Sequence, residues 1–370
     1  MKILVTHVPA GSGHEKAAEA ISNAVRKIRP DAEVTLMNGL DGMSSAYQWA
    51  FTQGYLGVIH KYPALWGTAY HLLDMKGLAW GAYKLHRLGN ASHGKVLEGI
   101  LTRHNPDVFI ATHFFPAEVA SYLKMKGRLK AKLITVITDY MPHSVWISPG
   151  TDAYVVGMEL TKQELIRRGI PPEKIHVLGI PIDPKFSQKV ERRALAARLG
   201  LDPIAFTLLI CSGGFGTGPV EPLVHALRNI QEPLQALVVT GKNTALYHRL
   251  ENLRPTFPHD LKVYGFVDNM DELMSVSDLM VTKPGGLSCT EAMMKELPMV
   301  LVAPIPGQEA RNAKIVDKFG AAVLAGPVEK APAIIQELRR DPARLKEMGH
   351  RGASAGRSNA AAETARLALA

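Results

Sequence analysis

The sequence predicts an α/β protein with two domains, each built on a parallel β-sheet. Three observations lead to this prediction. The length of 370 residues exceeds the usual size of a single domain. Short apolar runs alternate with helical segments in both halves, as in strand–helix–strand units. A glycine-rich loop follows the first apolar run of each half, at residues 8–15 and 212–219.

Composition favours a reducing compartment and an anionic partner. Cys211 and Cys289 are too few and too far apart for a disulfide scaffold. We expect no N-terminal signal, and no apolar run approaches the ~20 residues that span a bilayer. The net charge of +9 suits nucleic acid, anionic lipid or a phosphorylated substrate, or it serves solubility alone. Zinc-finger spacing and RNP-like aromatic patterns are missing, so we expect no nucleic-acid partner.

The first half opens with a strand at Met1–His7, a glycine loop and an alanine-rich helix through about Ile28. The loop lacks the third glycine of the dinucleotide fingerprint, which argues against NAD. His14 stands at the helix start, where the helix dipole lowers an imidazole pKa and favours the neutral form that a base requires. A purely structural histidine is the alternative.

Residues 40–95 are rich in aromatic and basic side chains, and three of the four tryptophans lie there. Tyrosine and tryptophan suit a membrane interface, since one end of each ring system is apolar and the other is polar. Lysine and arginine add attraction to anionic headgroups. An ordinary helical subdomain with an aromatic core is the competing interpretation.

The rest of the first half continues the alternation of strands and helices. A strand at Asp107–Ala111 precedes a loop at 112–116 and a helix at Ala117–Lys126. The strand Leu133–Thr138 then delivers Asp139. A carboxylate at the carboxyl end of a parallel strand is well placed for a site, so Asp139 is a candidate to orient His14 or to replace it as base.

The second half begins after the linker-like run 179–184. Its first strand, Ala205–Cys211, leads into four glycines within seven residues, beginning after Ser212. Free backbone N–H groups in such a loop suit a phosphate, and a simple turn is the alternative. Later strands are expected at Gln235–Thr240 and Leu261–Val267.

The stretch 281–312 carries the densest pattern. A strand at Asp278–Thr282 precedes Gly285 and Gly286, which permit close approach of a ligand to the backbone at the start of a helix. Glu291 suits sugar hydroxyls better than phosphate. A second strand, Met299–Ala303, delivers a loop with Gln308 and Glu309, which reach a second sugar. An ordinary strand–helix–strand unit is the alternative.

The chain ends with two expected helices, Ala331–Met348 and the alanine-rich Ala360–Leu369. The apolar last helix either packs on the first domain or forms an oligomer contact. The expected division is residues 1–180 with an insertion at about 40–95, residues 181–345, and a C-terminal segment 346–370.

In order along the chain, these motifs resemble the monogalactosyldiacylglycerol synthase and processive diacylglycerol glucosyltransferase family. That family belongs to the same branch as the lipid II-forming N-acetylglucosaminyltransferase. The resemblance rests on Gly-Ser-Gly-His at 11–14, on the Gly213-Gly214 loop and on the stretch from Gly285 to Glu309. It implies the GT-B fold, in which two Rossmann-like domains face each other across a cleft.

The resemblance also implies roles for individual residues. His14, or else Asp139, is the base beside the acceptor hydroxyl. Residues implied in acceptor or membrane binding are Tyr62, Pro63, Trp66, His143 and Trp146. Residues implied in donor binding are Gly13, Ser212, Gly213, Gly214, Phe266, Val267, Gly285, Gly286, Glu291, Gln308, Glu309 and Asn312. Of these, Phe266 and Val267 hold the uracil, Glu291 the ribose, and Gln308 and Glu309 the hexose.

The implied activity is inverting transfer of a hexose, glucose or galactose, from a UDP-sugar to the 3-hydroxyl of diacylglycerol. The implied setting is the cytoplasmic face of the cell membrane, with the protein bound peripherally to anionic lipid. The sequence has no Asp-x-Asp pair, so we expect neither a metal nor another cofactor. Alternatives are transfer of N-acetylglucosamine to a lipid-linked peptidoglycan precursor, a sugar-nucleotide epimerase, and a non-catalytic membrane- or nucleic-acid-binding module.

Overall fold

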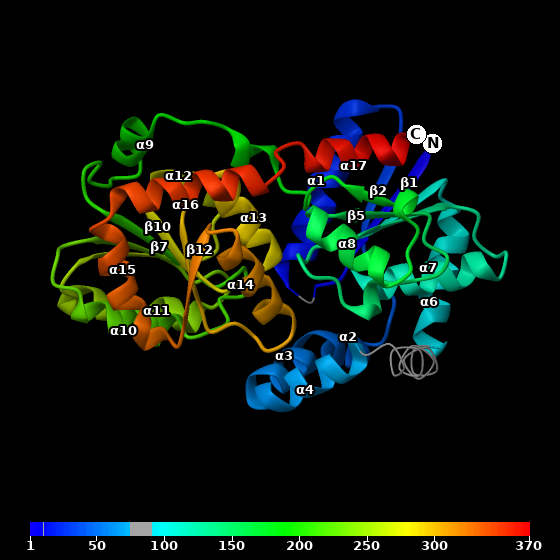
Figure 1. Cartoon of the computed structure of the whole chain (residues 1–370). Helices are drawn as coiled ribbons and strands as arrows, with labels where there is room; N and C mark the ends of the chain where they lie inside the picture. Colours follow the sequence, from blue (N-terminus) through cyan, green and yellow to red (C-terminus); the bar gives the residue numbers. More distant parts are fainter. Residues whose placement is uncertain (10, 75–90) are drawn as a thin grey trace. The chain divides into compact units, whose positions relative to one another are not determined.

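The structure, a computed structural model, describes residues 1–9, 11–74 and 91–370 (Figure 1). It divides into two compact units. The first unit contains Met1–Asp183, Ile305–Arg311 and Asn359–Ala370, and the second contains Pro184–Pro304 and Asn312–Ser358. Each unit is an α/β domain with its own parallel sheet, as the alternation of strands and helices predicts.

The sheet of the first unit has six strands in the order β2-β1-β3-β4-β5-β6. Every adjacent pair is parallel. Most strand residues are buried, as expected for a parallel sheet with helices on both faces. The strands are β1 (Lys2–His7), β2 (Glu33–Asn38), β3 (Val108–Ala111), β4 (Lys132–Val136), β5 (Ala153–Val156) and β6 (Ile175–Val177).

Helices cover both faces of this sheet. Ile3 and Val5 point to a core shared with α1 (Ser12–Ile28) and with the last helix, α17 (Ala360–Leu369). The alternate residue Leu4 packs in a second core beneath α6 (Ala91–His104) and α7 (Phe114–Met125). The apolar last helix therefore packs on the first unit, where it lies against α1 (Figure 1). Helix α8 (Glu159–Arg167) also belongs to this unit.

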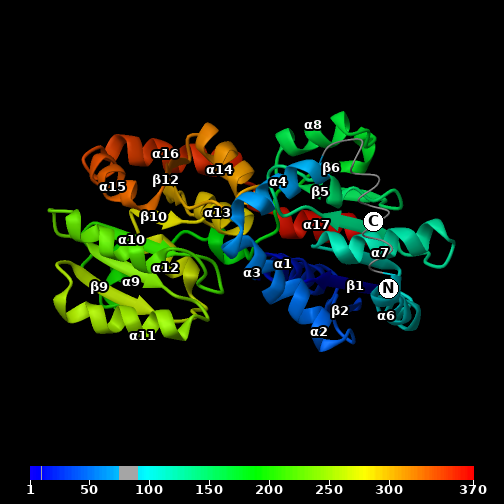
Figure 2. The same ribbon diagram turned by 90° about the horizontal axis from the view of Figure 1, so that it is seen from below.

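The described part of the aromatic and basic region is helical. It consists of α2 (Ser45–Trp49), a π-helical turn (Ala50–Gly54), α3 (Tyr55–Lys61) and α4 (Pro63–Asp74). Figure 2 shows these helices following one another in shades of blue. The predictions for residues 75–90 lie outside the described residues.

The sheet of the second unit also has six parallel strands, in the order β12-β11-β10-β7-β8-β9. Its strands are β7 (Thr207–Cys211), β8 (Gln235–Val239), β9 (Asp260–Tyr264), β10 (Leu279–Thr282), β11 (Met299–Val302) and β12 (Ala322–Gly326). Its longer helices are α11 (Thr244–Leu253), α13 (Gly286–Met294), α15 (Ala331–Arg339) and α16 (Pro342–Ala355), and its shorter ones are α9 (Arg192–Arg198), α10 (Val220–Ala226) and α12 (Met270–Val276). Helix α14 (Gln308–Lys318) begins in the first unit and continues in the second.

Three helix boundaries differ from the sequence-based expectation. Helix α7 begins at Phe114 rather than 117, because the His113 side chain caps it by accepting from the Phe115 N–H. The expected helix 331–348 is two helices, since the Asp341 side chain caps a new helix that starts with Pro342. Gln308 and Glu309 open α14 instead of lying on a loop.

Candidate functional site

His14 lies in the first turn of α1, and its imidazole is held in one orientation. Its Nδ1 is 2.6 Å from the carbonyl oxygen of Thr112, which follows β3. A carbonyl can only accept, so Nδ1 carries the proton and the neutral ring keeps its lone pair on Nε2. The Thr112 hydroxyl also donates to the His14 carbonyl at 2.8 Å. Two contacts with one threonine therefore fix both the backbone and the ring of His14.

The environment of His14 keeps its imidazole neutral. Burial lowers its pKa to about 4, and the hydrogen bond to Thr112 opposes that shift only in part. The direction is the one expected from the sequence, but burial rather than the helix dipole is the main cause. Aromatic rings surround it, with the ring of His113 at 4.8 Å and that of Trp146 at 6.1 Å between centroids. A neutral imidazole whose Nε2 carries the lone pair is competent as a general base.

Asp139 lies beyond the end of β4 and is 4% exposed. Its Oδ1 accepts a hydrogen bond of 2.6 Å from Nε2 of Gln308, which belongs to the same unit. Thr138, the preceding residue, places its hydroxyl 3.1 Å from Nδ1 of His14. The chain after β4 therefore places the Thr138 hydroxyl beside His14, whereas the Asp139 carboxylate is bonded to Gln308.

His143 and Trp146 are both buried, each 3% exposed. Nε2 of His143 donates to the carbonyl of Tyr70 at 2.9 Å, and Nδ1 accepts from the Val145 N–H at 3.2 Å. Both ring nitrogens thus have protein partners. His143 joins the end of β4 to α4, and any contact it makes with an acceptor is through its ring faces or edges.

The C-terminal end of α4 is anchored by a buried ion-pair network centred on Asp74. Its carboxylate accepts two hydrogen bonds from Arg168, at 2.6 and 3.1 Å, and one from Arg311 at 2.6 Å. The Ser144 N–H donates a further bond of 2.8 Å. Burial alone would raise the pKa of Asp74, but the bonds from both guanidinium groups outweigh it and lower that pKa. The network holds α4 in place.

Helices α2 to α4 expose large apolar side chains. The exposed residues are Trp49, Val58, Tyr62, Leu65, Leu72 and Leu73. Leu65, at 66%, is the most exposed, and Leu72 follows it seven residues later on the same side of α4. Pro63 opens α4, and Trp66 is part-buried against Tyr70. We call the six exposed side chains the apolar surface of α2–α4.

Other aromatic side chains of this region face inward. Tyr47 and Phe51 pack against the core cluster that contains Phe115. The described part of this region therefore has aromatic side chains packed in the core and also an exposed apolar surface, and its predicted role at a membrane stays a prediction. Among the described residues, none of the helices combines the length and apolar character needed to cross a bilayer.

The glycine loop of the second unit, residues 213–218, connects β7 to α10. Gly213, Gly216 and Gly218 have φ of 68°, 60° and 129°, which only glycine adopts without strain. A Cβ at Gly216 would collide with the carbonyl oxygen of Thr240. The loop is closed by the Ser212 hydroxyl, which donates to the Thr217 carbonyl. Its shape is therefore built into the backbone.

Residues that follow β8 also donate hydrogen bonds to carbonyl groups of this loop. The Lys242 N–H donates to the Gly214 carbonyl at 2.9 Å, and the Asn243 amide donates to the Gly216 carbonyl at 3.1 Å. The Lys242 ammonium also lies 5.7 Å from the ring of Phe215 and 5.8 Å from that of Phe266. Phe266, 48% exposed, and Val267 follow β9, and Lys242 thus lies near both Phe266 and Phe215 of the glycine loop.

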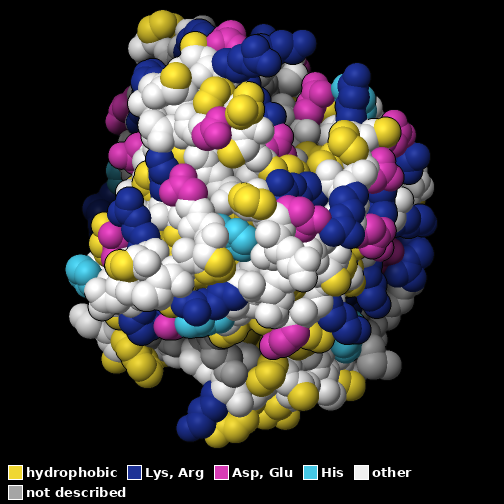
Figure 3. Space-filling model, turned by 90° about the vertical axis from the view of Figure 1, so that its left-hand side faces the viewer, with side chains coloured by type: hydrophobic (Ala, Val, Ile, Leu, Met, Phe, Trp, Pro, Cys, Tyr) yellow, Lys and Arg dark blue, Asp and Glu magenta, His cyan; other side chains and the backbone are white. Residues whose placement is uncertain are grey.

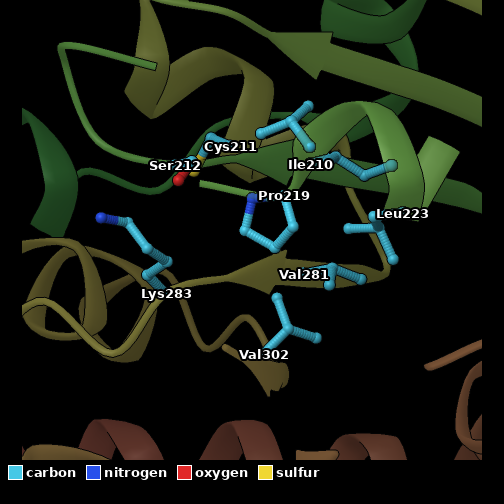
Figure 4. A pocket seen from close by; sticks show the side chains of 9 residues that line it. Ile210, Cys211, Ser212, Pro219, Leu223, Val281, Lys283 and Val302 are labelled. Carbon is cyan, nitrogen blue, oxygen red and sulfur yellow. The ribbon is translucent and has the colours of Figure 1, made fainter. Parts of the chain in front are cut away.

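A small cavity lies between the ends of β7 and β10 (Figure 4). It is lined by Ile210, Cys211, Ser212, Pro219, Val220, Leu223, Val281, Lys283 and Val302. Burial raises the pKa of Cys211 to about 11, so this thiol stays protonated. Apart from Ser212 and Lys283, the lining residues are apolar or carry a neutral thiol.

Gly285 caps α13, and Gly286 is the first residue of that helix. A Cβ built on Gly285 meets no atom within 4 Å, so its backbone faces open space. Glu291 lies on the same helix and is part-buried. Burial is the main cause of the raised pKa of Cys211, and the charge of Glu291 raises it further.

The side chains of Gln308 and Glu309, at the start of α14, both make hydrogen bonds within the protein. The Glu309 carboxylate accepts a 2.9 Å bond from the Ile305 N–H, which caps its own turn, and Gln308 is bonded to Asp139. Asn312, on the same helix, is buried at 1% exposed. Gly13 lies in the first turn of α1, next to His14.

Sequence reasoning missed Thr112, Asn243 and the Asp74 network. Thr112 follows a predicted strand, and that position was a usable signal. The other contacts join residues far apart in the chain. Within the described ranges, His, Cys, Asp and Glu nowhere form a group of three or more that could hold a metal ion. Figure 3 shows basic and acidic side chains interspersed on the visible face.

Comparison with known families assigns the two halves separately. The monogalactosyldiacylglycerol (MGDG) synthase family matches residues 14–182. The glycosyltransferase family 28 C-terminal domain matches residues 220–364.

Among solved structures, the chain is similar to Acinetobacter baumannii MurG, with a TM-score of 0.65 at 15% identity, covering 100% of this chain and 99% of that one. It is also similar to the Neisseria meningitidis UDP-GlcNAc 2-epimerase bound to UDP-GlcNAc, with a TM-score of 0.63 at 14% identity, covering 100% of both chains. These likenesses confirm the expected GT-B fold.

Two curated relatives are closer in sequence. The processive diacylglycerol beta-glucosyltransferase of Bacillus pumilus (strain SAFR-032) is 35% identical over 263 residues, which is 71% of this chain and 67% of that protein. The protein of the same name from Bacillus cereus (strain ZK / E33L) is 30% identical over 351 residues, 94% of this chain and 88% of that protein. The chain therefore belongs to the family of the processive diacylglycerol beta-glucosyltransferases.

Proposed function

We propose that this protein is an inverting glycosyltransferase that moves a glucosyl group from UDP-glucose to the 3-hydroxyl of diacylglycerol, making a membrane glycolipid. Membership of the family supports the reaction class and the lipid acceptor. The names of the relatives favour glucose over galactose. The observation on which the mechanism rests is the 2.6 Å contact that puts the proton of His14 on Nδ1 and its lone pair on Nε2.

His14 is the general base in this mechanism. Its Nε2 takes the proton of the acceptor hydroxyl while that oxygen attacks the anomeric carbon. The bond from this carbon to the diphosphate oxygen breaks on the opposite face, and its electron pair leaves with UDP. Inversion follows from the single displacement. Thr112 keeps the proton on Nδ1 throughout, so that Nε2 remains the basic atom.

The second unit binds the nucleotide. The glycine loop at residues 213–218 and the start of α13 bind the diphosphate. Glu291 accepts bonds from the ribose hydroxyls, and the chain at Phe266 and Val267 holds the uracil. Gln308 and Glu309, supported by the buried Asn312, contact the hexose. Asp139, bonded to Gln308, positions that amide rather than acting as the base.

The acceptor side uses lipid contact. The apolar surface of α2–α4 supplies side chains that gain free energy when they leave water. The Lys61 ammonium lies 5.6 Å from the centre of the exposed Tyr62 ring, so a positive charge lies beside the apolar surface of α2–α4. We propose that this surface docks peripherally on the anionic cytoplasmic face of the cell membrane, where diacylglycerol is presented.

We propose further that protein groups alone neutralise the leaving diphosphate, without a divalent metal or another cofactor. The preorganised glycine loop supports this, because donors fixed before the reaction need no reorganisation as charge develops. Activity that survives a chelator tests this point.

The decisive experiment is a transfer assay on vesicles. The purified protein is incubated with vesicles of phosphatidylglycerol and diacylglycerol and with UDP-glucose, UDP-galactose or UDP-N-acetylglucosamine, and the lipids are identified by mass spectrometry. We expect glucosyldiacylglycerol from UDP-glucose. A galactolipid alone would change the donor. Transfer only to an undecaprenyl-linked muramyl peptide would replace the acceptor, and nucleotide turnover without any glycolipid would refute the proposal.

A further inference from the structure

Lys283 is a cationic side chain that the mechanism above does not use. It follows Thr282, the last residue of β10, in the sequence Lys-Pro-Gly-Gly. Its carbonyl accepts a 2.8 Å bond from the Gly285 N–H and a 3.2 Å bond from the Thr282 hydroxyl. The backbone of Lys283 is thus fixed between a central strand of the sheet and the start of α13.

The side chain of Lys283 runs along the glycine loop. A Cβ added to Gly218 would lie 3.3 Å from Cδ and 3.6 Å from Cε of Lys283, and 2.7 Å from Oγ of Ser212. The Nζ atom lies 3.5 Å from the Thr217 hydroxyl. Figure 4 shows this side chain at the cavity with Ser212 and Pro219. The absence of a side chain at Gly218 therefore leaves room for the lysine stem against the loop.

The charge of Lys283 belongs to the same end of the sheet as the proposed nucleotide site. The pKa of Cys211, raised by burial, is raised further by Glu291 and lowered by the Lys283 ammonium. Lys283 follows the carboxyl end of β10, and Glu291 lies on α13, which begins three residues after Lys283. A nucleoside diphosphate carries both hydroxyls that suit a carboxylate and phosphates that suit an ammonium.

We propose that Lys283 is a catalytic residue whose ammonium binds the diphosphate of the donor and stabilises the negative charge on UDP as its bond to the sugar breaks. This inference rests on the proposed function. In the displacement, the electron pair of the breaking bond moves to the diphosphate oxygen. Lys283 donates hydrogen bonds to the diphosphate and transfers no proton. Ammonium and glycine-loop amides together take the place of a metal ion.

A purely structural role for Lys283 makes a different prediction. If the ammonium served only to hold Thr217, its loss would disturb the whole loop and would weaken every ligand of the second unit. If it binds diphosphate, its loss weakens only ligands that carry phosphate. Uridine and UDP share a nucleoside and differ in the diphosphate, so the pair separates the two roles.

The test is a titration of uridine and UDP into wild type, Lys283→Met and Lys283→Arg, measured by ligand-observed NMR. Lys314→Met, which removes an exposed lysine of α14, is the matched control for charge. For Lys283→Met we expect uridine affinity within about twofold of wild type and UDP affinity roughly 10- to 100-fold weaker. Lys283→Arg keeps most of the UDP affinity, and Lys314→Met changes neither.

Turnover provides the second readout. We expect Lys283→Met to lower kcat by about 10²-fold, because an electrostatic donor to the transition state is lost. Equal weakening of uridine and UDP, or unchanged UDP affinity and kcat, would overturn the role of Lys283. UDP binding needs no lipid acceptor, so a failure of the glycolipid assay would leave this result intact. A wild-type protein that does not bind UDP would refute both proposals.

Discussion

The glycine loop at 213–218 and the apolar surface of α2–α4 represent two ways of building a binding region. The loop is defined by its backbone: three glycines have positive φ, and a side chain at Gly216 would strike Thr240. The α2–α4 surface is defined by side chains that ordinary helices leave in water. A backbone site is intolerant of change at single positions, whereas an apolar surface depends on summed area.

His14 differs from both regions, because its proposed role is to accept one proton, that of the acceptor hydroxyl. The largest effect we expect is from His14→Ala, which removes the base and lowers kcat/KM for glycolipid formation by about 10²–10⁴-fold. UDP affinity should stay at the wild-type value. Steady-state kinetics and a UDP titration measure the two quantities. Near wild-type turnover would move the role of base to Asp139.

Gly216→Ala should have the next largest effect. The new Cβ meets the Thr240 carbonyl and φ is unfavourable, so the loop must deform, and we expect UDP affinity to fall at least tenfold together with the thermal midpoint. Gly285→Ala is the matched variant, because its Cβ meets no protein atom. It should keep the midpoint of wild type and weaken UDP binding only. If both variants were equally stable, the loop would not be defined by its backbone.

Removing apolar area from α4 should have a graded effect. Leu65→Ser and Leu72→Ser should each weaken binding to anionic vesicles by up to about tenfold, and the double variant by roughly the product. Vesicle sedimentation measures this. Ile204→Ser is the control, because Ile204 is 83% exposed but lies in the second unit. A loss as large in the Ile204 variant would show that α2–α4 is not the docking surface.

A chelator should have the smallest effect. With EDTA in excess over all divalent ions, we expect the rate of glycolipid formation to stay within about twofold of the untreated rate, because protein groups neutralise the diphosphate. The assay is the vesicle transfer reaction. A rate that collapses with EDTA and returns with magnesium would contradict the metal-free mechanism.

The same contrast explains which features the sequence predicts. Glycine spacing encodes the loop locally, so the region around Gly213 and Gly214 is found from sequence. The contacts that pin it are not, because Asn243 reaches Gly216 from 27 residues away. The tautomer of His14 depends on Thr112, 98 residues later. Exposure in α2–α4 depends on packing, which aromatic content alone does not determine.

Errors at helix ends have a similar origin. The break before Pro342 carried a usable signal, Asp341-Pro342, because aspartate caps helices and proline opens them. The start of α14 at Gln308 carried no such signal. There the Glu309 carboxylate accepts from the Ile305 N–H, and this contact depends on the turn at Gly307, which has φ 98°. The sequence therefore predicts the start of a helix where the capping residue lies directly before it, as Asp341 does.

The pH dependence of kcat/KM in the wild-type protein tests most directly whether His14 acts as a neutral base. Since burial lowers its pKa from 6.5 to about 4, the imidazole stays unprotonated and active well below pH 6.5. We predict a rate constant that is flat from pH 8 to about pH 5 and falls through pH 4. A half-maximal point near pH 6.5 would show that the histidine is solvated and would contradict the buried, Thr112-oriented base.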